Sequence, residues 1–272
     1  MDLNERFLEG KGALITGGAS GFGKGVALEY AKRGADIVLV DINEELLEET
    51  SKYIEEKSKS KVISIVCDVS QATQVKSMAN KAFEEFDNIY ILFNNAGISP
   101  GYGKDILKAD EKIWDSTINV NLKGQWLVSK FICRNMRRQK FEPLAGKVIH
   151  MASDFGMKVD ITVPIYSISK AAIITLMQVF AKTLAPKITV NSISPGFHVT
   201  GLYGNSEEVM IQTMKIGNVK TPLNRIGTIE DIVNIALFLA SPESDFITGH
   251  NFPVDGGIAE VGVPPNYFKT NI

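Results

Sequence analysis

The stretch GALITGGASGFG (12–23) decides the fold class, because it joins a short apolar strand to a glycine turn and the start of a helix. The helical pattern continues to about residue 33. Gly17, Gly21 and Gly23 can adopt backbone angles closed to other residues, and they let a ligand approach the backbone closely. Free N–H groups at a helix start favour a phosphate group, so the stretch indicates a nucleotide-binding turn.

The rest of the chain repeats this alternation of strand and helix. We expect strands at 12–16, 35–40, 62–66, 89–93, 147–151, 188–193 and 251–254, and helices at 22–33, 43–58, 71–86, 111–139, 166–184 and 229–240. Near-continuous apolar strands separated by helices indicate a parallel sheet with helices on both faces. Right-handed crossovers then give a Rossmann-like, doubly wound α/β fold with a mainly seven-stranded sheet.

A single domain over residues 1–272 is the economical interpretation, because no linker, repeat or low-complexity segment interrupts the pattern. The least regular segment is 197–228, and a loop this long in a compact domain is usually functional. Its apolar content favours a substrate-binding lid over a plain surface connection. A C-terminal tail, 258–272, follows the last expected strand.

The composition is that of a soluble globular protein, with 44% hydrophobic and 22% charged residues and a net charge of −2. This charge argues against a binder of nucleic acid or anionic membranes, which needs excess Lys and Arg. The N-terminus is too charged for a signal peptide, and no apolar run approaches the length of a membrane span. We therefore expect a cytoplasmic protein that binds neither nucleic acid nor membranes.

Cysteine and histidine content argues against a disulfide framework or a metal site. Cys67 and Cys133 are too few for such a framework. The three histidines are scattered and lack metal-ligand spacing. We expect a reduced, metal-independent protein.

Asp41 ends the second expected strand, 18 residues after Gly23. A carboxylate at this position can accept hydrogen bonds from both ribose hydroxyls of an adenosine, and it repels a 2′-phosphate. Ser20, and no Lys or Arg, precedes Gly21. The sequence therefore favours NAD, with NADP the weaker alternative. Asp41 could also cap the helix that follows.

The pair YSISK (166–170) places a phenol and an ammonium group one helical turn apart. A second copy of the spacing, YIEEK (53–57), shows that the spacing alone proves nothing. The neighbouring residues must decide which pair carries chemistry.

Several further motifs resemble, in the same order, those of the short-chain dehydrogenase/reductase family, and they span residues 12 to about 257. They are TGGASGFG (16–23), NNAG (94–97), NVNLKG (119–124), Ser153 in MASDFG, YSISK (166–170), PGFHVT (195–200) and VDGG (254–257). Tyr166 lies 13 residues after Ser153, between an expected strand and helix, whereas Tyr53 lies in a charged helix as part of a solvated face. YSISK is therefore the better candidate for the Tyr–Lys pair that carries proton chemistry.

The resemblance implies the catalytic roles of four residues. Tyr166 removes the substrate's hydroxyl proton as hydride leaves for NAD, or donates a proton in reduction. Lys170 lowers the phenol pKa from its usual value of about 10 and holds the cofactor ribose. Ser153 orients the substrate oxygen, and Asn121 holds a water that links Lys170 to solvent. For Ser153 or Asn121 alone, the alternative is a strand-end cap or a helix hydrogen bond.

The resemblance also implies the binding residues. At the cofactor we expect Gly17, Ser20, Gly21, Phe22, Gly23, Asp41, Ile42, Asp68, Val69, Asn95, Ala96, Gly97, Tyr166, Lys170, Pro195, Gly196, His198 and Thr200. At the substrate we expect Ser153, Phe155, Tyr166, Phe197 and Tyr203. Asp68 has an equally good alternative as a helix N-cap. His198 stands where the family more often has an aliphatic residue, and we expect no catalytic part for it.

The leading interpretation is an NAD-dependent oxidoreductase that interconverts a secondary alcohol (polyol, sugar or cyclic alcohol) and its ketone. The alternative is a 3-oxoacyl-thioester (ACP or CoA) reductase; such reductases generally use NADPH and carry basic residues at the glycine turn. A remote alternative is a non-catalytic dinucleotide-binding protein, because a fold alone never secures a function.

Association is expected from the segment 171–184, which is apolar on more than one face. The family usually pairs this helix with its copy, so we expect a homodimer or homotetramer. Burial against a loop of the same chain is the alternative. The tail after residue 257 could reach the pocket of a partner subunit.

Overall fold

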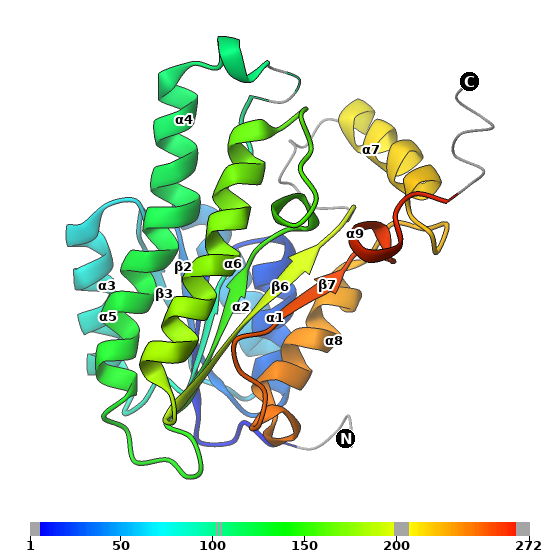
Figure 1. Cartoon of the computed structure of the whole chain (residues 1–272). Coiled ribbons are helices and arrows are strands. Elements are labelled where there is room, and N and C mark those ends of the chain that lie inside the picture. The colour runs from blue at the N-terminus through cyan, green and yellow to red at the C-terminus, as the bar shows by residue number, and fades with distance from the viewer. Residues whose placement is uncertain (1–5, 102, 104, 199–206, 265–272) are drawn as a thin grey trace.

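Seven strands form one parallel sheet in the computed structural model, in the order β3-β2-β1-β4-β5-β6-β7 (Figure 1). The structure describes residues 6–264 except 102, 104 and 199–206. The strands are β1 Gly12–Thr16, β2 Asp36–Asp41, β3 Val62–Val66, β4 Ile91–Asn94, β5 Gly146–Met151, β6 Ile188–Pro195 and β7 Asn251–Val254. The expected doubly wound α/β fold is confirmed as one domain around one sheet.

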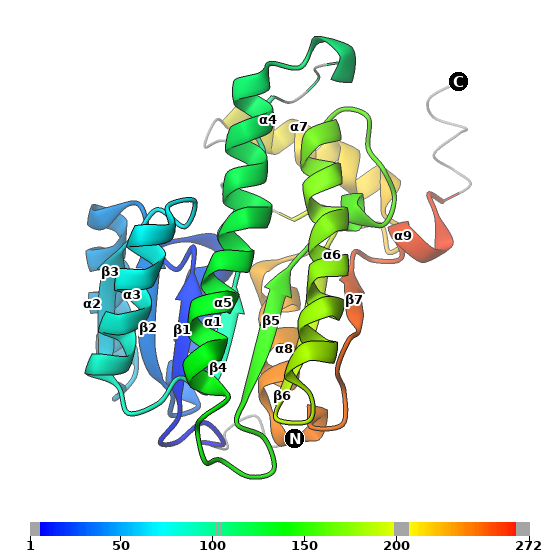
Figure 2. The same ribbon diagram turned by 60° about the vertical axis from the view of Figure 1, so that its left-hand side comes forward.

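Helices cover both faces of the sheet. The described α-helices are α1 Gly21–Lys32, α2 Glu44–Lys57, α3 Ala72–Glu85, α4 Glu111–Thr117, α5 Gln125–Met136, α6 Pro164–Leu184, α7 Glu207–Lys220, α8 Ile229–Ala240 and α9 Ile258–Val261. Alternate strand residues divide the core in two, as expected for side chains that point to opposite faces of a strand. Helices α1, α2 and α8 pack on the cluster that contains Ile15, and α3, α5 and α6 pack on the cluster that contains Leu14. Figure 2 shows α3, α5 and α6 in front of the strands.

The register of the parallel strands brings their carboxyl ends to one edge of the sheet. Thr16 at the end of β1 pairs with Val40 of β2 and Asn94 of β4, and Asn94 pairs with His150 of β5. In open parallel sheets, ligands bind outside this edge, at the point where the strand order reverses. That point lies between β1 and β4, so the edge is where the site should be sought.

Two helical regions differ from the sequence prediction. The helix expected at 111–139 is α4, a π-helical segment η2 at Ile118–Gly124, and α5. The irregular segment expected at 197–228 contains α7, whose Gly217 approaches the side chain of Phe197. Packing explains the second difference. Glycine disfavours a helix, and the contact between Gly217 and Phe197 that stabilises α7 joins residues distant in sequence.

Helix α6 is the one described helix long and apolar enough to cross a membrane by length and composition, with a mean hydropathy of 1.3. The sequence-based expectation that no apolar run approaches this length is wrong on that criterion. The helix nevertheless packs on the sheet, with Ile173 and Met177 fully buried. The core helix of a soluble protein passes the same test, so the finding is weak evidence for a membrane span.

Candidate active site

A cavity of about 480 Å³ opens at the carboxyl edge of the sheet. This volume lies in the usual range for small-molecule sites. Its walls come from the turn after β1, the ends of β2, β4, β5 and β6, and the first turns of α6. It is lined by Gly17, Ser20, Gly21, Phe22, Asp41, Leu46, Asn95, Gly97, Met151, Ala152, Ser153, Tyr166, Lys170, Pro195, Gly196 and His198. Most of the residues expected at the cofactor therefore meet in one place.

The glycine turn needs its glycines for two different reasons. Gly17 and Gly21 have φ values of +64° and +51°, in the left-handed region that favours glycine. A Cβ at Gly23 would lie well inside van der Waals contact with the Gly17 carbonyl oxygen, so only glycine lets the helix approach the turn. Around Gly21, by contrast, no atom lies within 4 Å of where a Cβ would stand. The start of α1 therefore faces open space, as an anion site requires.

Asp41 lies at the end of β2, on the neighbouring side of this turn. Its carboxylate accepts hydrogen bonds from the backbone N–H groups of Ala19 at 3.2 Å, Ile42 at 2.7 Å and Asn43 at 3.1 Å. The N-cap of α2 is Asn43, which accepts from Leu46 N, so the alternative role of Asp41 as a helix cap is wrong. Three backbone bonds hold the carboxylate in the wall of the cavity.

Tyr166 and Lys170 lie one turn apart at the start of α6, and both are buried. Lys170 Nζ is 5.5 Å from the centre of the Tyr166 ring and donates to the backbone oxygen of Met151 at 2.8 Å. Burial lowers the pKa of Lys170 to about 7. Tyr53 instead lies on the exposed side of α2, with 39% of its surface accessible. The structure thus separates the two Tyr–Lys pairs, and only the 166–170 pair lines the cavity.

Ser153 follows β5 and caps the short 3-10 helix η3, Asp154–Gly156, by accepting from Phe155 N at 3.2 Å. Its hydroxyl donates to Asp154 Oδ1 at 3.1 Å. Burial is the main cause that raises the pKa of Asp154 to about 7. The strand-end cap considered for Ser153 is therefore present, and the same residue also lines the cavity.

Asn121 lies in η2 and does not itself line the cavity. Its side-chain oxygen accepts from Ile98 N at 2.8 Å, and its amide donates to Ile98 O at 2.9 Å and Ser169 Oγ at 3.0 Å. Ser169 in turn donates to the backbone oxygen of Tyr166 at 2.7 Å. These partners use both amide protons and one lone pair of the amide oxygen, so its second lone pair is what the side chain can offer to the expected water link to Lys170.

A buried polar network behind Lys170 was not foreseen from the sequence. Gln125 Nε2 donates to Met151 O at 3.1 Å, the same oxygen that binds Lys170. The Gln125 side-chain oxygen lies 2.8 Å from Nδ1 of His150. Burial lowers the pKa of His150 to about 3, so the ring is neutral and Nδ1 is the donor. The single signal in the sequence was a histidine next to the apolar residues Val148, Ile149 and Met151 of this strand.

His198 follows β6 and packs between the glycine turn and the start of α8. Its Nδ1 lies 3.1 Å from Gly196 O, and its ring meets the Phe22 ring edge-on at 5.2 Å. Its Nε2 is buried without a hydrogen-bond partner among the described residues. Burial is the main cause that lowers the pKa of this imidazole. His198 is therefore a buried, neutral part of the cavity wall.

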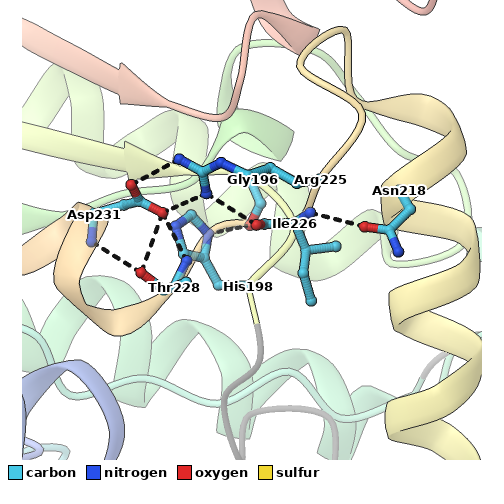
Figure 3. A network of polar contacts seen from close by, with 7 residues as sticks. All are labelled: Gly196, His198, Asn218, Arg225, Ile226, Thr228 and Asp231. Carbon is cyan, nitrogen blue, oxygen red and sulfur yellow. Dashed lines mark hydrogen bonds and ion pairs between the residues drawn. The ribbon is translucent and has the colours of Figure 1, made fainter.

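An ion pair beside His198 fixes the start of α8 (Figure 3). Arg225 binds both carboxylate oxygens of Asp231, at 2.7 and 2.9 Å. Asp231 Oδ2 also accepts from Thr228 N at 2.8 Å, and Thr228 caps α8 in return. Ile226 N donates to Asn218 of α7 at 3.0 Å. The end of α7 is thereby tied to the rigid part of the domain.

Other expected site residues lie outside the cavity wall. Gly23, Ile42, Asp68, Val69, Ala96, Phe155 and Phe197 do not line it, and Thr200 and Tyr203 lie outside the described residues. Gln71 is the N-cap of α3, so the alternative role of Asp68 as a cap is wrong. Phe155 and Phe197 meet edge-to-face at 6.0 Å, as an apolar wall would require. Leu46, Met151 and Ala152 line the cavity and were not predicted.

The residues present fit a dinucleotide. The start of α1 offers open space and free N–H groups for phosphates. The strand order β2-β1-β4-β5 places Asp41 and Ser153 on opposite sides of the glycine turn. A cavity with a carboxylate on one side of a phosphate site and a phenol, an ammonium group and a hydroxyl on the other suits nucleotide binding and proton transfer together.

Comparison with known proteins agrees with this geometry. The family model described as Enoyl-(Acyl carrier protein) reductase matches residues 17–259. 3-Oxoacyl-[acyl-carrier-protein] reductase FabG of Thermotoga maritima is 35% identical over 254 residues, which cover 92% of this chain and 98% of that protein. 2-Dehydro-3-deoxy-D-gluconate 5-dehydrogenase of Dickeya dadantii is 34% identical over 260 residues, covering 94% and 98%.

Solved structures give the same result. A short-chain type dehydrogenase/reductase from Mycobacterium marinum matches with a TM-score of 0.85 at 33% identity, over 94% of this chain and 98% of that chain. NAD+-bound xylitol dehydrogenase matches with a TM-score of 0.82 at 30% identity, over 92% and 99%. The chain therefore belongs to the short-chain dehydrogenase/reductase family of oxidoreductases.

Proposed function

We propose that the protein is an NAD-dependent oxidoreductase that interconverts a secondary alcohol (a polyol, sugar or cyclic alcohol) and its ketone. One observation carries the proposal: the Asp41 carboxylate and the groups of Ser153, Tyr166 and Lys170 line the same cavity. Catalytic groups are judged as a constellation, and this one combines a nucleotide site with a proton donor and acceptor.

In this proposal Tyr166 takes the hydroxyl proton of the alcohol, and in reduction it returns that proton to the ketone oxygen. The nearby Lys170 favours the phenolate when it is charged, and it thereby lowers the pKa of the phenol. Ser153 binds the substrate oxygen and orients it. Asn121 and Ser169 hold the turn of α6 that carries the phenol. A bound nicotinamide nucleotide supplies the hydride acceptor or donor.

The preference for NAD rests on Asp41. A carboxylate in the cavity wall, fixed by three backbone N–H groups, repels the 2′-phosphate of NADP. Of the described residues that line the cavity, Lys170 is the only Lys or Arg, and it lies at the opposite side from Asp41. The NAD+-bound state of the related xylitol dehydrogenase supports the same choice.

Reduction of a 3-oxoacyl thioester is the second candidate. The description of the matching family model and the similarity to the Thermotoga maritima reductase favour it. We expect a reductase of this class to use NADPH, and Ser20 and Asp41 offer no cation for its extra phosphate. We therefore rank this function second.

Calorimetric titration with NADH and NADPH, followed by a turnover panel, tests the proposal. The panel contains xylitol, cyclohexanol and acetoin with their ketones, and acetoacetyl-CoA as the thioester. We expect NADH to bind at least about tenfold more tightly than NADPH, and Asp41→Ser to reduce this ratio by about tenfold. Preference for NADPH with turnover of acetoacetyl-CoA would place the second candidate first. Binding of neither nucleotide would contradict both.

We also propose that the protein is a cytoplasmic homodimer or homotetramer that acts on a small molecule. The apolar residues that α6 leaves exposed support the association. Residues 265–272 of the tail lie outside the described residues, so its contact with a partner's pocket stays a prediction. Deletion of 261–272 with unchanged kinetics and assembly would contradict that contact.

A further inference from the structure

We infer that Asp154 is a positioning residue for the reaction proposed above: its carboxyl group controls whether the Ser153 hydroxyl can donate a hydrogen bond to the substrate oxygen. The inference rests on the proposed function, because it takes Ser153 as the group that binds this oxygen. Asp154 does not line the cavity, so it acts through its neighbour.

The geometry directs the serine proton away from the substrate. Ser153 Oγ donates to Asp154 Oδ1 at 3.1 Å. The backbone N–H of Phe155 lies 2.8 Å from Asp154 Oδ1 and 3.2 Å from Ser153 Oγ, so it holds both side chains in place. A hydroxyl has one proton. While that proton lies on the carboxylate, Ser153 offers the cavity only lone pairs.

The surroundings of Asp154 allow this carboxyl group to change its charge near neutral pH. It is 3% exposed, and burial raises its pKa to about 7 against the effect of its two hydrogen bonds. The negative charges of Asp255 and Asp160 contribute to this raised pKa in the same direction as burial. Elements packed around η3 bring four charged or titratable groups to this region: Asp160 before α6, Tyr166 and Lys170 on α6, and Asp255 after β7.

The two charge states leave Ser153 with different hydrogen-bonding capacity. The protonated carboxyl group can donate to Ser153 Oγ, and the serine proton is then free for the substrate oxygen. The ionised carboxylate attracts the serine proton through a charge-assisted bond, which is about twice as strong as a neutral one. The substrate oxygen becomes more negative in the transition state and needs donors there. Ionisation of Asp154 therefore weakens transition-state binding.

The effect must be the same in both directions of the reaction. Oxidation and reduction share one transition state, and the enzyme does not change the equilibrium constant. A charge on Asp154 therefore lowers kcat/KM for the alcohol and for the ketone by one common factor. Because the fixed equilibrium constant requires this common factor whenever cofactor binding is unchanged, unequal changes in the two directions would instead report altered binding of NAD or NADH.

Asp154→Asn is the main test, because asparagine keeps the acceptor for Phe155 N but cannot ionise. The holoenzyme is assayed with NAD(H) and the best alcohol–ketone pair of the panel, from about pH 6 to about pH 9. We expect the ratio of kcat/KM, variant over wild type, to rise about tenfold over this range, less than the hundredfold or more for a lost oxyanion donor. All other titratable groups of the site are the same in both proteins, so the ratio isolates Asp154.

Asp160→Asn is the matched control. It removes a nearby negative charge and keeps an acceptor for Thr162 N, and the side-chain hydrogen bonds of Asp160 go to Thr162 rather than to Ser153. We expect the kcat/KM ratio of Asp160→Asn to wild type to change by less than about threefold over the same pH range. The small change comes from a downward shift of the Asp154 pKa. The inference would be overturned if the kcat/KM ratio of Asp154→Asn to wild type did not change with pH. That result is expected if Asp154 only caps the turn and does not act on Ser153.

Two further outcomes are distinguishable. If Asp154→Asn does not fold, Asp154→Ala removes the same charge with a smaller side chain and is assayed in the same way. Wild-type protein that binds neither nucleotide or turns over no pair would contradict the proposed function, and this inference with it. Active wild-type protein with parallel pH profiles for both Asp154 variants would overturn the inference alone.

Discussion

Tyr166 and Tyr53 have the same relation to a lysine four positions later, and their surroundings separate them. Tyr166 is buried beside Lys170 in the cavity wall, whereas Tyr53 faces solvent on α2. Because Tyr166 is the proposed proton donor and acceptor, we expect Tyr166→Phe to lower kcat/KM by about 10²- to 10⁴-fold. The dissociation constant for NADH should change by less than about threefold. Steady-state kinetics and calorimetry measure the two effects.

Tyr53→Phe is the matched control for this substitution. It removes the same hydroxyl from the same sequence spacing at an exposed site that does not line the cavity, so its kinetics should equal those of the wild type. Full activity of Tyr166→Phe would exclude the phenol as the acid and base. Equal losses of kcat/KM in Tyr166→Phe and Tyr53→Phe would show that the assay reports protein stability and not the chemical step.

His150 gives a prediction for acid stability. Burial lowers the pKa of its imidazole to about 3, whereas an unfolded histidine has a pKa of about 6.5. The unfolded state therefore binds one more proton between these values, and this residue lowers the free energy of unfolding as pH falls from about 6.5 towards 3. The amide of asparagine can replace Nδ1 as donor. We therefore expect His150→Asn to reduce the slope of the free energy of unfolding against pH by up to about 1.4 kcal/mol per pH unit.

Urea unfolding at several acidic pH values measures this slope. The variant and wild type are compared by how the free energy of unfolding changes with pH. Its value at a single pH is not used, because loss of the ring also removes packing against Phe180 at every pH. Identical slopes would show that His150 does not set the acid limit. Carboxyl groups titrate in both proteins, so the difference in slope reports the histidine.

Residues of the site were predictable where the chain keeps them in short motifs. Gly17, Gly21, Ser153, Tyr166 and Lys170 each stand in such a motif, and the structure places all five in the cavity wall. The contact of His150 with Gln125 joins residues 25 positions apart, on a strand and a helix. No spacing in the sequence reports such a pair, because only the packing of α5 on the sheet creates it.

At the scale of elements, strands were predicted better than helices. The bounds of β1, β3 and β7 agree with the expected ranges, because each is a short run rich in apolar residues, although only β1 is buried throughout and β3 and β7 are edge strands. The π-helical segment η2 was missed, since the side-chain contacts of Asn121 with Ile98 and Ser169 hold it. These partners lie 23 and 48 positions away. Local periodicity could not show them.

The junction between β6 and α8 gives a prediction at this scale. His198 and Gly227 form an isolated parallel bridge, and a Cβ at Gly227 would overlap the His198 imidazole. Gly227→Ala should therefore push the ring towards the cavity, at a cost of about 1–3 kcal/mol from overpacking. We expect NADH to bind about tenfold more weakly, because His198 and Gly196 line the cavity.

The double variant Gly227→Ala/His198→Ala tests the cause. Removal of the imidazole leaves room for the new methyl group, so NADH affinity should return to that of His198→Ala alone. Calorimetry measures all three variants. Additive losses in the double variant would show that the effect of Gly227→Ala does not come from the space beside His198.

At the scale of the whole molecule, α6 connects the site with the outer surface. One side of this helix carries Tyr166 and Lys170 and packs on the sheet, with Ile173 and Met177 buried. The other side leaves Ile168 and Val179 44% and 57% exposed. Helix α5 runs next to α6 over the same face of the sheet (Figure 2) and exposes Trp126. The apolar character that makes α6 resemble a membrane span is thus divided between core and surface.

This exposed side is the surface on which the proposed association depends. Ile168 and Val179 are eleven positions apart, which is close to three full turns, so they lie on one face of the helix. Val179→Glu would bury an unpaired charge in a contact between two copies of α6, at a cost of several kcal/mol. We expect it to shift the molar mass, measured by light scattering after gel filtration, from an oligomer to the monomer. Val66→Glu is the matched control, because Val66 is similarly exposed, at 49%, on the edge strand β3. An unchanged mass for Val179→Glu, with the control also unchanged, would show that the subunits associate through another surface or not at all.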